Sequence, residues 1–179
     1  LIINKIFATT EIKDLLTFSW SSVITVILIA IVLNYLIFLG KNTLHEIYGE
    51  DYFYSKLYES AQQLKYASRT DTIPLLNAKA SSLTFYQKGA WALFVLHEEI
   101  GDKAFKKAVK SYLKKHAFQS VTTVDFFTEI KKVSDYDVHN FSKVWLENTA
   151  FNTQQVNSLL LKNKSIQVLF EVEKLKSKP

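Results

Sequence analysis

The sequence predicts an all-α fold, on the basis of three observations. Only four glycines and two prolines occur among 179 residues, which leaves too little turn chemistry for a many-stranded sandwich or barrel. Hydrophobic residues make up 48% of the chain and charged residues 22%, a globular rather than a disordered composition. From residue 44 onward, apolar residues recur at helical spacing behind recognisable start signals. We therefore expect a helical bundle preceded by a hydrophobic segment.

Residues 1–43 form this hydrophobic N-terminal segment. No charged residue occurs from Leu15 to Gly40, and Val23 to Leu39 is an Ile/Val/Leu run with only two polar interruptions. The run reaches the lower end of the length that a bilayer-spanning helix needs. Three interpretations stay open: a membrane span over residues 20–40, an element buried in a larger protein, and a mis-framed segment. Lysines flank the run on both sides and no signal-peptide pattern is present, so orientation and compartment are undetermined.

Composition excludes several functions. Cysteine is absent, so the chain has no disulfide, no thiolate nucleophile and no cysteine-ligated metal. Of 22 basic residues only Arg69 is arginine, which argues against specific nucleic-acid recognition. The chain contains no methionine and starts at Leu1. We therefore expect either a processed chain or a piece of a longer one, and we favour the second interpretation.

The first helix is expected to run from Asp51, as its N-cap, to about Ser68. Its apolar stripe consists of Phe53, Leu57, Ala61 and Leu64. Residues 69–82 contain Pro74 and are expected to form a loop.

A second helix is expected from Leu83 to Ile100, with Gly101 as its C-terminal cap. A third is expected to open at Asp102. Its apolar face consists of Ala104, Phe105, Ala108, Val109, Tyr112 and Leu113. Its opposite face consists of Lys103, Lys106, Lys107, Lys110, Lys114 and Lys115. We interpret the lysines as a solvated face, with membrane or nucleic-acid binding as the less favoured alternatives.

Two pairs have the spacing of a capping box, Thr122 with Asp125 and Ser134 with Asp137, and each is expected to open a further helix. Residues 152–179 are expected to form a short helical tail with two helices. A strand over residues 165–172 is the alternative.

Two His-Glu pairs are candidates for a zinc-binding motif. His45-Glu46 and His97-Glu98 both begin like the helical His-Glu-x-x-His motif, but the second histidine is replaced by Gly49 and Gly101. The other two histidines are isolated. The chain is therefore expected to hold no metal or other cofactor of its own, and no phosphate-binding loop or serine-hydrolase elbow is present.

The most specific stretch is Tyr-Gln-Lys-Gly-Ala-Trp at residues 86–91. It is followed by Ile-Gly-Asp-Lys-Ala-Phe at 100–105, Thr-Thr-Val-Asp-Phe-Phe at 122–127 and a Trp-Leu pair closing 141–146, and preceded by Tyr-Gly-Glu-Asp-Tyr-Phe at 48–53. This ordered set resembles the gluzincin zinc aminopeptidases of the aminopeptidase N (membrane alanyl aminopeptidase) type.

The resemblance covers residues 44–151 and implies the helical C-terminal half of a thermolysin-like catalytic domain. In that family, zinc polarises the scissile carbonyl, a glutamate activates water, and a tyrosine donates a hydrogen bond to the developing oxyanion. The tyrosine matches Tyr86. A peptide substrate and zinc are thereby implied for the full-length parent.

The sequence also lacks motifs that define the family's active site. The His-Glu-x-x-His helix, the following acidic ligand and the Gly-Ala-Met-Glu-Asn-like strand are all missing, and no carboxylate lies between Asp14 and Glu46. We therefore expect a metallo-aminopeptidase fragment that is inactive alone. The alternative is a membrane-tethered helical interaction module without catalytic activity, and neither reading involves nucleic acid.

Overall fold

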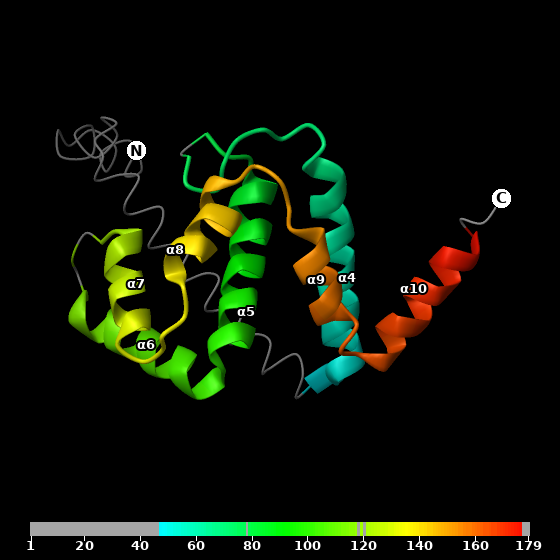
Figure 1. Ribbon diagram of the computed structural model, residues 1–179. Coiled ribbons are helices and arrows are strands. Elements are labelled where there is room, and N and C mark those ends of the chain that lie inside the picture. The colour runs from blue at the N-terminus through cyan, green and yellow to red at the C-terminus, as the bar shows by residue number, and fades with distance from the viewer. Residues whose placement is uncertain (1–46, 78, 118, 120, 177–179) are drawn as a thin grey trace, which may run out of the picture.

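The computed structural model describes residues 47–77, 79–117, 119 and 121–176, and within these ranges every regular element is a helix (Figure 1). In chain order these helices are α4 (Glu50–Ala67), η1 (Leu83–Lys88), α5 (Gly89–Ile100), α6 (Asp102–Lys115), α7 (Thr123–Lys131), α8 (Val138–Phe141), η2 (Ser142–Glu147), α9 (Thr153–Leu160) and α10 (Lys164–Lys176). The predicted all-α class is confirmed.

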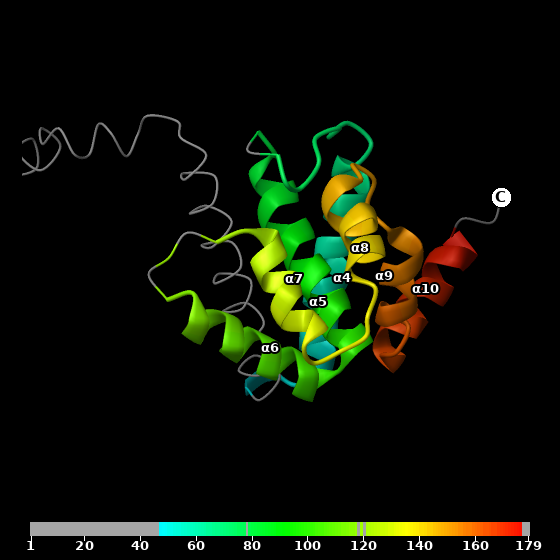
Figure 2. The same cartoon turned by 60° about the vertical axis from the view of Figure 1, so that its left-hand side comes forward.

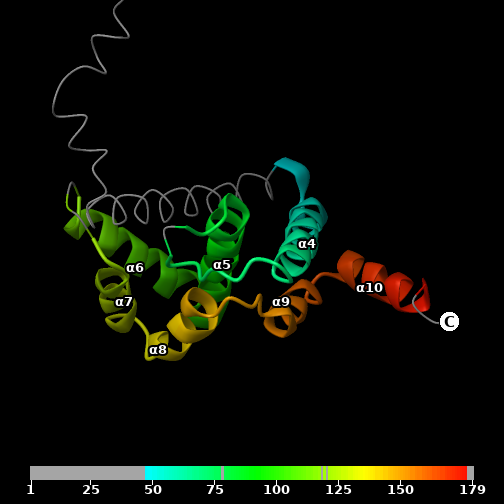
Figure 3. The same cartoon turned by 90° about the horizontal axis from the view of Figure 1, so that it is seen from above.

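The helices form an elongated array. Seen from above, α6 and α7 lie at one end, α5 and α8 in the middle, α4 beside α9, and α10 at the other end (Figure 3). The same order is visible from the side, where α4, α5 and α9 stand next to one another (Figure 1). The largest side chains of the core, Trp91, Trp145, Tyr112 and Phe105, come from α5, η2 and α6, so these elements share one apolar interior.

The first described helix begins differently from the prediction. The N-cap of α4 is Gly49, at φ 83°, and no side chain caps the helix. Asp51 lies inside the first turn, where its Oδ1 accepts a hydrogen bond of 2.8 Å from Asn163 Nδ2. The predicted cap is therefore wrong: Asp51 ties α4 to the segment between α9 and α10. The apolar stripe is otherwise as expected, since Phe53, Ala61 and Leu64 are buried.

The predicted second helix is continuous, but its first part, η1, is π-helical and its second part, α5, is α-helical. A second π-helical segment, η2, directly continues α8. π-Helical turns are rare and occur most often at functional sites. The two segments come together in the fold, as the contacts of Lys88 described below show.

The turn between α5 and α6 follows the prediction for Gly101. Gly101 has φ 83° and ψ 154°, a conformation that side-chain-bearing residues rarely adopt, and its N–H bonds to His97 O at 2.8 Å. Asp102 lies in the first turn of α6 but does not cap it. Phe105, Ala108, Val109 and Tyr112 are buried, as predicted.

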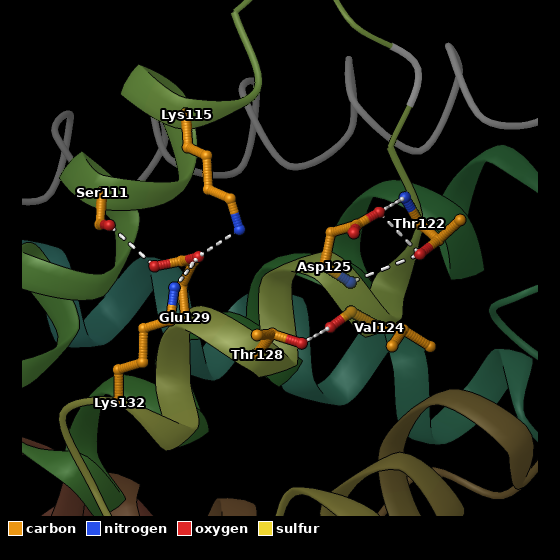
Figure 4. A network of polar contacts seen from close by, with 8 residues as sticks. All are labelled: Ser111, Lys115, Thr122, Val124, Asp125, Thr128, Glu129 and Lys132. Atoms are coloured by element: carbon orange, nitrogen blue, oxygen red, sulfur yellow. Dashed lines mark hydrogen bonds and ion pairs between the residues drawn. The ribbon is translucent and has the colours of Figure 1, made fainter.

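Helix α7 begins with the predicted capping box. The Thr122 N–H donates to Asp125 Oδ2 at 2.7 Å, and the Asp125 N–H donates to Thr122 Oγ1 at 3.4 Å (Figure 4). The second predicted box is wrong. Asp137 is itself the N-cap of α8 and accepts from the N–H groups of His139 and Asn140, whereas the Ser134 hydroxyl accepts from Tyr136 N–H. The tail is helical in α9 and α10, so the strand alternative is also wrong.

No helix of the described ranges has the length and apolar character to cross a bilayer. The uncharged run from Val23 to Leu39 lies outside the described residues, and its three interpretations stay open.

Candidate functional site

Tyr86 lies in the middle of the π-helical turn η1. Its side chain is 43% exposed, and its ring packs edge-on against Phe85 with the ring centroids 5.3 Å apart. The aromatic neighbour supports one side of the ring. Tyr86 therefore presents a phenol, a group able to donate one hydrogen bond, at the surface of the described structure.

The next residue anchors the turn to α4. Gln87 Oε1 accepts a hydrogen bond of 2.8 Å from the Ser60 hydroxyl, and Gln87 Nε2 donates to Gln63 Oε1 at 3.1 Å. Both partners belong to α4, so one face of η1 is fixed against that helix.

Asp71 anchors the start of the turn. Its Oδ2 accepts from the hydroxyls of Thr84, at 2.6 Å, and Ser81, at 2.7 Å. These two hydrogen bonds, Thr84 first, hold the pKa of the Asp71 carboxyl below its usual range, and the Lys88 ammonium contributes in the same direction. A carboxylate thus fixes the loop onto the first residues of η1.

Lys88 anchors the other side of the turn. Its side chain is buried, and its Nζ donates to the main-chain carbonyls of Asn148, at 2.6 Å, and Thr149, at 3.2 Å. Burial lowers the pKa of this ammonium, while Asp71 acts in the opposite direction. Because Asn148 is the C-cap of η2, Lys88 joins the two π-helical segments.

Trp91 completes the anchoring one turn further along the helix. It is 1% exposed and packs edge-on against Phe94 and Phe151, and Phe151 in turn packs edge-on against Trp145. Of the motif at residues 86–91, the lysine and the tryptophan therefore point inward and the tyrosine outward. These contacts fix the turn that carries Tyr86 against α4, the end of η2 and the aromatic core.

The described residues offer no zinc site. They contain no group of three His, Cys, Asp or Glu side chains that could hold a metal ion. His97 lies between two carboxylates, with Nδ1 3.2 Å from Glu98 Oε1 and Nε2 3.2 Å from Asp102 Oδ1, at the junction of α5 and α6. His45, the other half-motif, lies outside the described residues. The donor set present in the described ranges does not fit the metal.

The sequence singles out Tyr86 as the candidate residue but does not indicate the contacts that hold its turn. Nothing in the sequence links Lys88 to residues 148–149, which are 60 positions away, or indicates the two π-helical turns. The one available signal is a lysine directly before the apolar run at residues 89–96, because such a residue must find acceptors when it is buried.

Comparisons with known proteins add an independent line of evidence. The family described as "Peptidase family M1 domain" matches residues 44–145. Aminopeptidase N of Lactococcus lactis subsp. lactis is 30% identical over 76 residues, covering 42% of this chain and 9% of the relative. Aminopeptidase N of Streptomyces lividans is 37% identical over 67 residues, covering 37% and 8%. Aminopeptidase 2 of Candida albicans is 28% identical over 97 residues, covering 52% and 10%.

The match therefore spans about a tenth of the length of these curated relatives. No solved structure matches the chain significantly.

Proposed function

The chain belongs to peptidase family M1, and on this premise we propose that residues 44–151 supply the helical C-terminal part of a zinc aminopeptidase catalytic domain. In this role Tyr86 donates a hydrogen bond from its phenol to the oxyanion that develops as the peptide bond is attacked. The observation that carries the proposal is the position of Tyr86 on a turn fixed by Gln87 and Lys88, with its own side chain exposed.

Physical chemistry supports this role for a tyrosine held in this way. A donor stabilises a transition state most when it is already aimed at the place where charge develops, because no reorganisation is then needed during the reaction. The phenol is rigid beyond two torsions, and Phe85 packs against its ring. One such donor contributes on the order of 3 kcal/mol in known enzymes.

Zinc belongs to the family's chemistry, but the residues that the structure describes do not fit the metal. The sequence also contains no His-Glu-x-x-His motif from which a general base could come. A phenol alone does not replace the metal and the base, which supply most of the barrier reduction in such reactions. We therefore propose that this chain, by itself, does not hydrolyse peptides.

The test is a hybrid enzyme assayed beside the chain itself. In Lactococcus lactis aminopeptidase N, the segment that corresponds to residues 44–160 is replaced by those residues of this chain, so that the Tyr86 turn moves together with its partners on α4, at Asp71 and after η2. We expect the hybrid to release the N-terminal residue of a short peptide with a kcat within about tenfold of the relative, since the anchored turn transfers as one unit. The purified chain alone should give no release above the blank.

Two controls decide the result. The relative with Ala at the position that corresponds to Tyr86 should lose most of its kcat, and zinc content should be equal in the hybrid and the relative. Release by this chain alone that EDTA abolishes would contradict the proposal, as would an inactive hybrid that is folded and zinc-loaded.

The second candidate is a membrane-tethered helical interaction module that keeps the family's bundle as a scaffold. The observation that favours it is the uncharged run from Val23 to Leu39. A tethered chain would stay with membranes through carbonate extraction, whereas a buried or mis-framed run would give an aggregating protein.

A further inference from the structure

Positive charge is concentrated at one end of the molecule. Between Asp102 and Asp135 the sequence has eight lysines and four acidic residues, so this segment carries four of the chain's five net positive charges. It forms α6, α7 and their connections, which lie at the end opposite α10 (Figures 1 and 3). The surface of these two helices is therefore the strongly charged patch of the described structure.

Five of these lysines form one basic face, which we define as Lys103, Lys107, Lys110 and Lys114 of α6 together with Lys131 of α7. The four on α6 follow the spacing i, i+4, i+7 and i+11, so they line one side of the helix over about 16 Å. All five are exposed, and none of them forms an ion pair with another described residue. The opposite side of α6 is buried in the core.

The two helices that carry the basic face are locked together. Glu129 of α7 is fully buried and accepts hydrogen bonds from the Ser111 hydroxyl, at 2.8 Å, and from Lys115 and Lys132, at 3.3 and 2.5 Å (Figure 4). These contacts fix α7 against α6. The remaining lysines are thus presented on a rigid support.

A groove joins the two parts of the basic face. It has a volume of about 630 Å³ and lies between the first turn of α6 and the end of α7. The groove is lined by Lys103 and Lys107 of α6 and by Lys131 of α7 and the adjoining Lys132, together with Asp102 and Asp135. Ammonium groups from both helices therefore converge on one open depression, which suits an anionic headgroup.

We propose that the basic face binds the surface of an anionic lipid bilayer. Lysines near such a surface are attracted to it by its negative potential, without any fixed geometry. The ammonium is a point charge on a flexible stem, which suits mobile headgroups better than it suits a defined phosphate geometry. Under the membrane-span interpretation, the uncharged run from Leu15 to Gly40 would supply a second, apolar signal in the same chain, and stable membrane attachment takes two such signals.

The same observations disfavour nucleic acid as the occupant. Arg69, the chain's one arginine, lies outside this segment, so bidentate contacts to phosphates and bases are missing from it. Val124 is the one exposed large apolar residue among the described residues of α6 and α7, so the surface has no aromatic platform for stacking bases.

The test is flotation of the full chain with lipid vesicles, which separates bound protein from aggregates. Vesicles of phosphatidylcholine are compared with vesicles that contain about one third phosphatidylserine. We expect at least tenfold tighter binding to the phosphatidylserine vesicles, and most of this difference should disappear at about 0.5 M salt, because exposed charges are then screened. Equal binding to both vesicles would overturn the proposal.

Two variants with the same loss of charge localise the effect. The test variant changes Lys103, Lys107, Lys110 and Lys114 to Gln. The matched control changes Lys65, Lys79, Lys164 and Lys176 to Gln. These four lysines are also exposed, and none of them forms an ion pair with a described residue. Affinity for phosphatidylserine vesicles should fall at least tenfold in the test variant and less than about threefold in the control.

Three further results complete the test. If the fourfold variant does not fold, the double variant Lys107→Gln/Lys110→Gln should still lose about threefold or more. An equal loss in the test and control variants would show only a net-charge effect and would overturn the proposal. Binding to duplex DNA that is tighter than binding to the vesicles would identify a nucleic-acid surface and would overturn it as well.

Discussion

Replacing Tyr86 with Phe in the hybrid enzyme is expected to lower kcat by about 100- to 1000-fold. The substitution removes one hydroxyl and leaves the ring, so the packing against Phe85 is retained. Because the donor acts on charge that exists only in the transition state, KM should change by less than about threefold. Steady-state kinetics with an alanyl peptide measure both quantities.

The control for this variant is Phe85→Leu in the same hybrid. It removes the aromatic neighbour of Tyr86 but keeps the phenol hydroxyl, so kcat should fall much less than in Tyr86→Phe. A hybrid that keeps its kcat after Tyr86→Phe would make Tyr86 a packing residue. A parallel loss of bound zinc would instead show that the hybrid had misfolded, which circular dichroism and metal analysis detect.

The Glu129→Gln variant of the full chain is expected to be destabilised by about 2 kcal/mol at neutral pH. Glu129 is fully buried, and its carboxylate accepts from Ser111, Lys115 and Lys132 (Figure 4). The amide keeps the shape but loses the charge, and its NH₂ group faces donors rather than acceptors. Urea unfolding followed by circular dichroism measures the difference.

The lowered pKa of the Glu129 carboxyl also determines how the free energy of unfolding should change with pH. Its hydrogen bonds, with that from Lys132 the largest cause, lower the pKa of Glu129 from 4.5 to about 2. A lowered pKa means that the unfolded chain takes up the proton first, so the stabilisation is complete above about pH 4.5 and is lost as the pH falls toward 2. The expected loss is on the order of 2 kcal/mol, less than the full shift would give, because both lysines are half exposed and screened by solvent.

A matched control separates this buried carboxylate from ordinary ion pairs. Glu59 pairs with Lys56 at 2.8 Å, but both side chains are about half exposed. Glu59→Gln should cost less than about 0.5 kcal/mol. Between pH 4.5 and 2, the full chain should lose more stability than the Glu129→Gln variant, and equal losses would contradict the assigned role of Glu129.

Helix positions could be predicted from the sequence where the signal is local. The Thr122 and Asp125 pair lies three residues apart and satisfies both halves of its box within one turn, so spacing alone identifies it. Ser134 and Asp137 have the same spacing, but Asp137 finds N–H groups of its own downstream and becomes the cap. Asp51 likewise bonds to a residue 112 positions away instead of to its own helix. Spacing does not reveal which of two competing partners a carboxylate takes.

Of the candidate site, only Tyr86 could be predicted from the sequence, and the contacts that hold its turn could not. Tyr86 was identified by the resemblance of the motif that contains it. Its turn is held by contacts of Gln87 and Lys88 with segments 27 and 60 residues away, and helical periodicity carries no information about such contacts. Four of the five lysines of the basic face belong to the lysine face predicted for α6, whereas Lys131 and the groove join it only because α7 lies beside α6.

The hydrogen bonds from Lys88 to the two carbonyls after η2 determine where a recombinant form of this domain can end. The family match ends at residue 145, before Asn148 and Thr149. A domain ending there would leave the Lys88 ammonium buried with neither acceptor, a state that costs several kcal/mol and is relieved only by moving the side chain into water. It would also lack Gln155, which accepts from Trp145 Nε1 at 2.9 Å. The smallest unit that keeps the Tyr86 turn intact therefore extends through α9, beyond the boundary that sequence similarity marks.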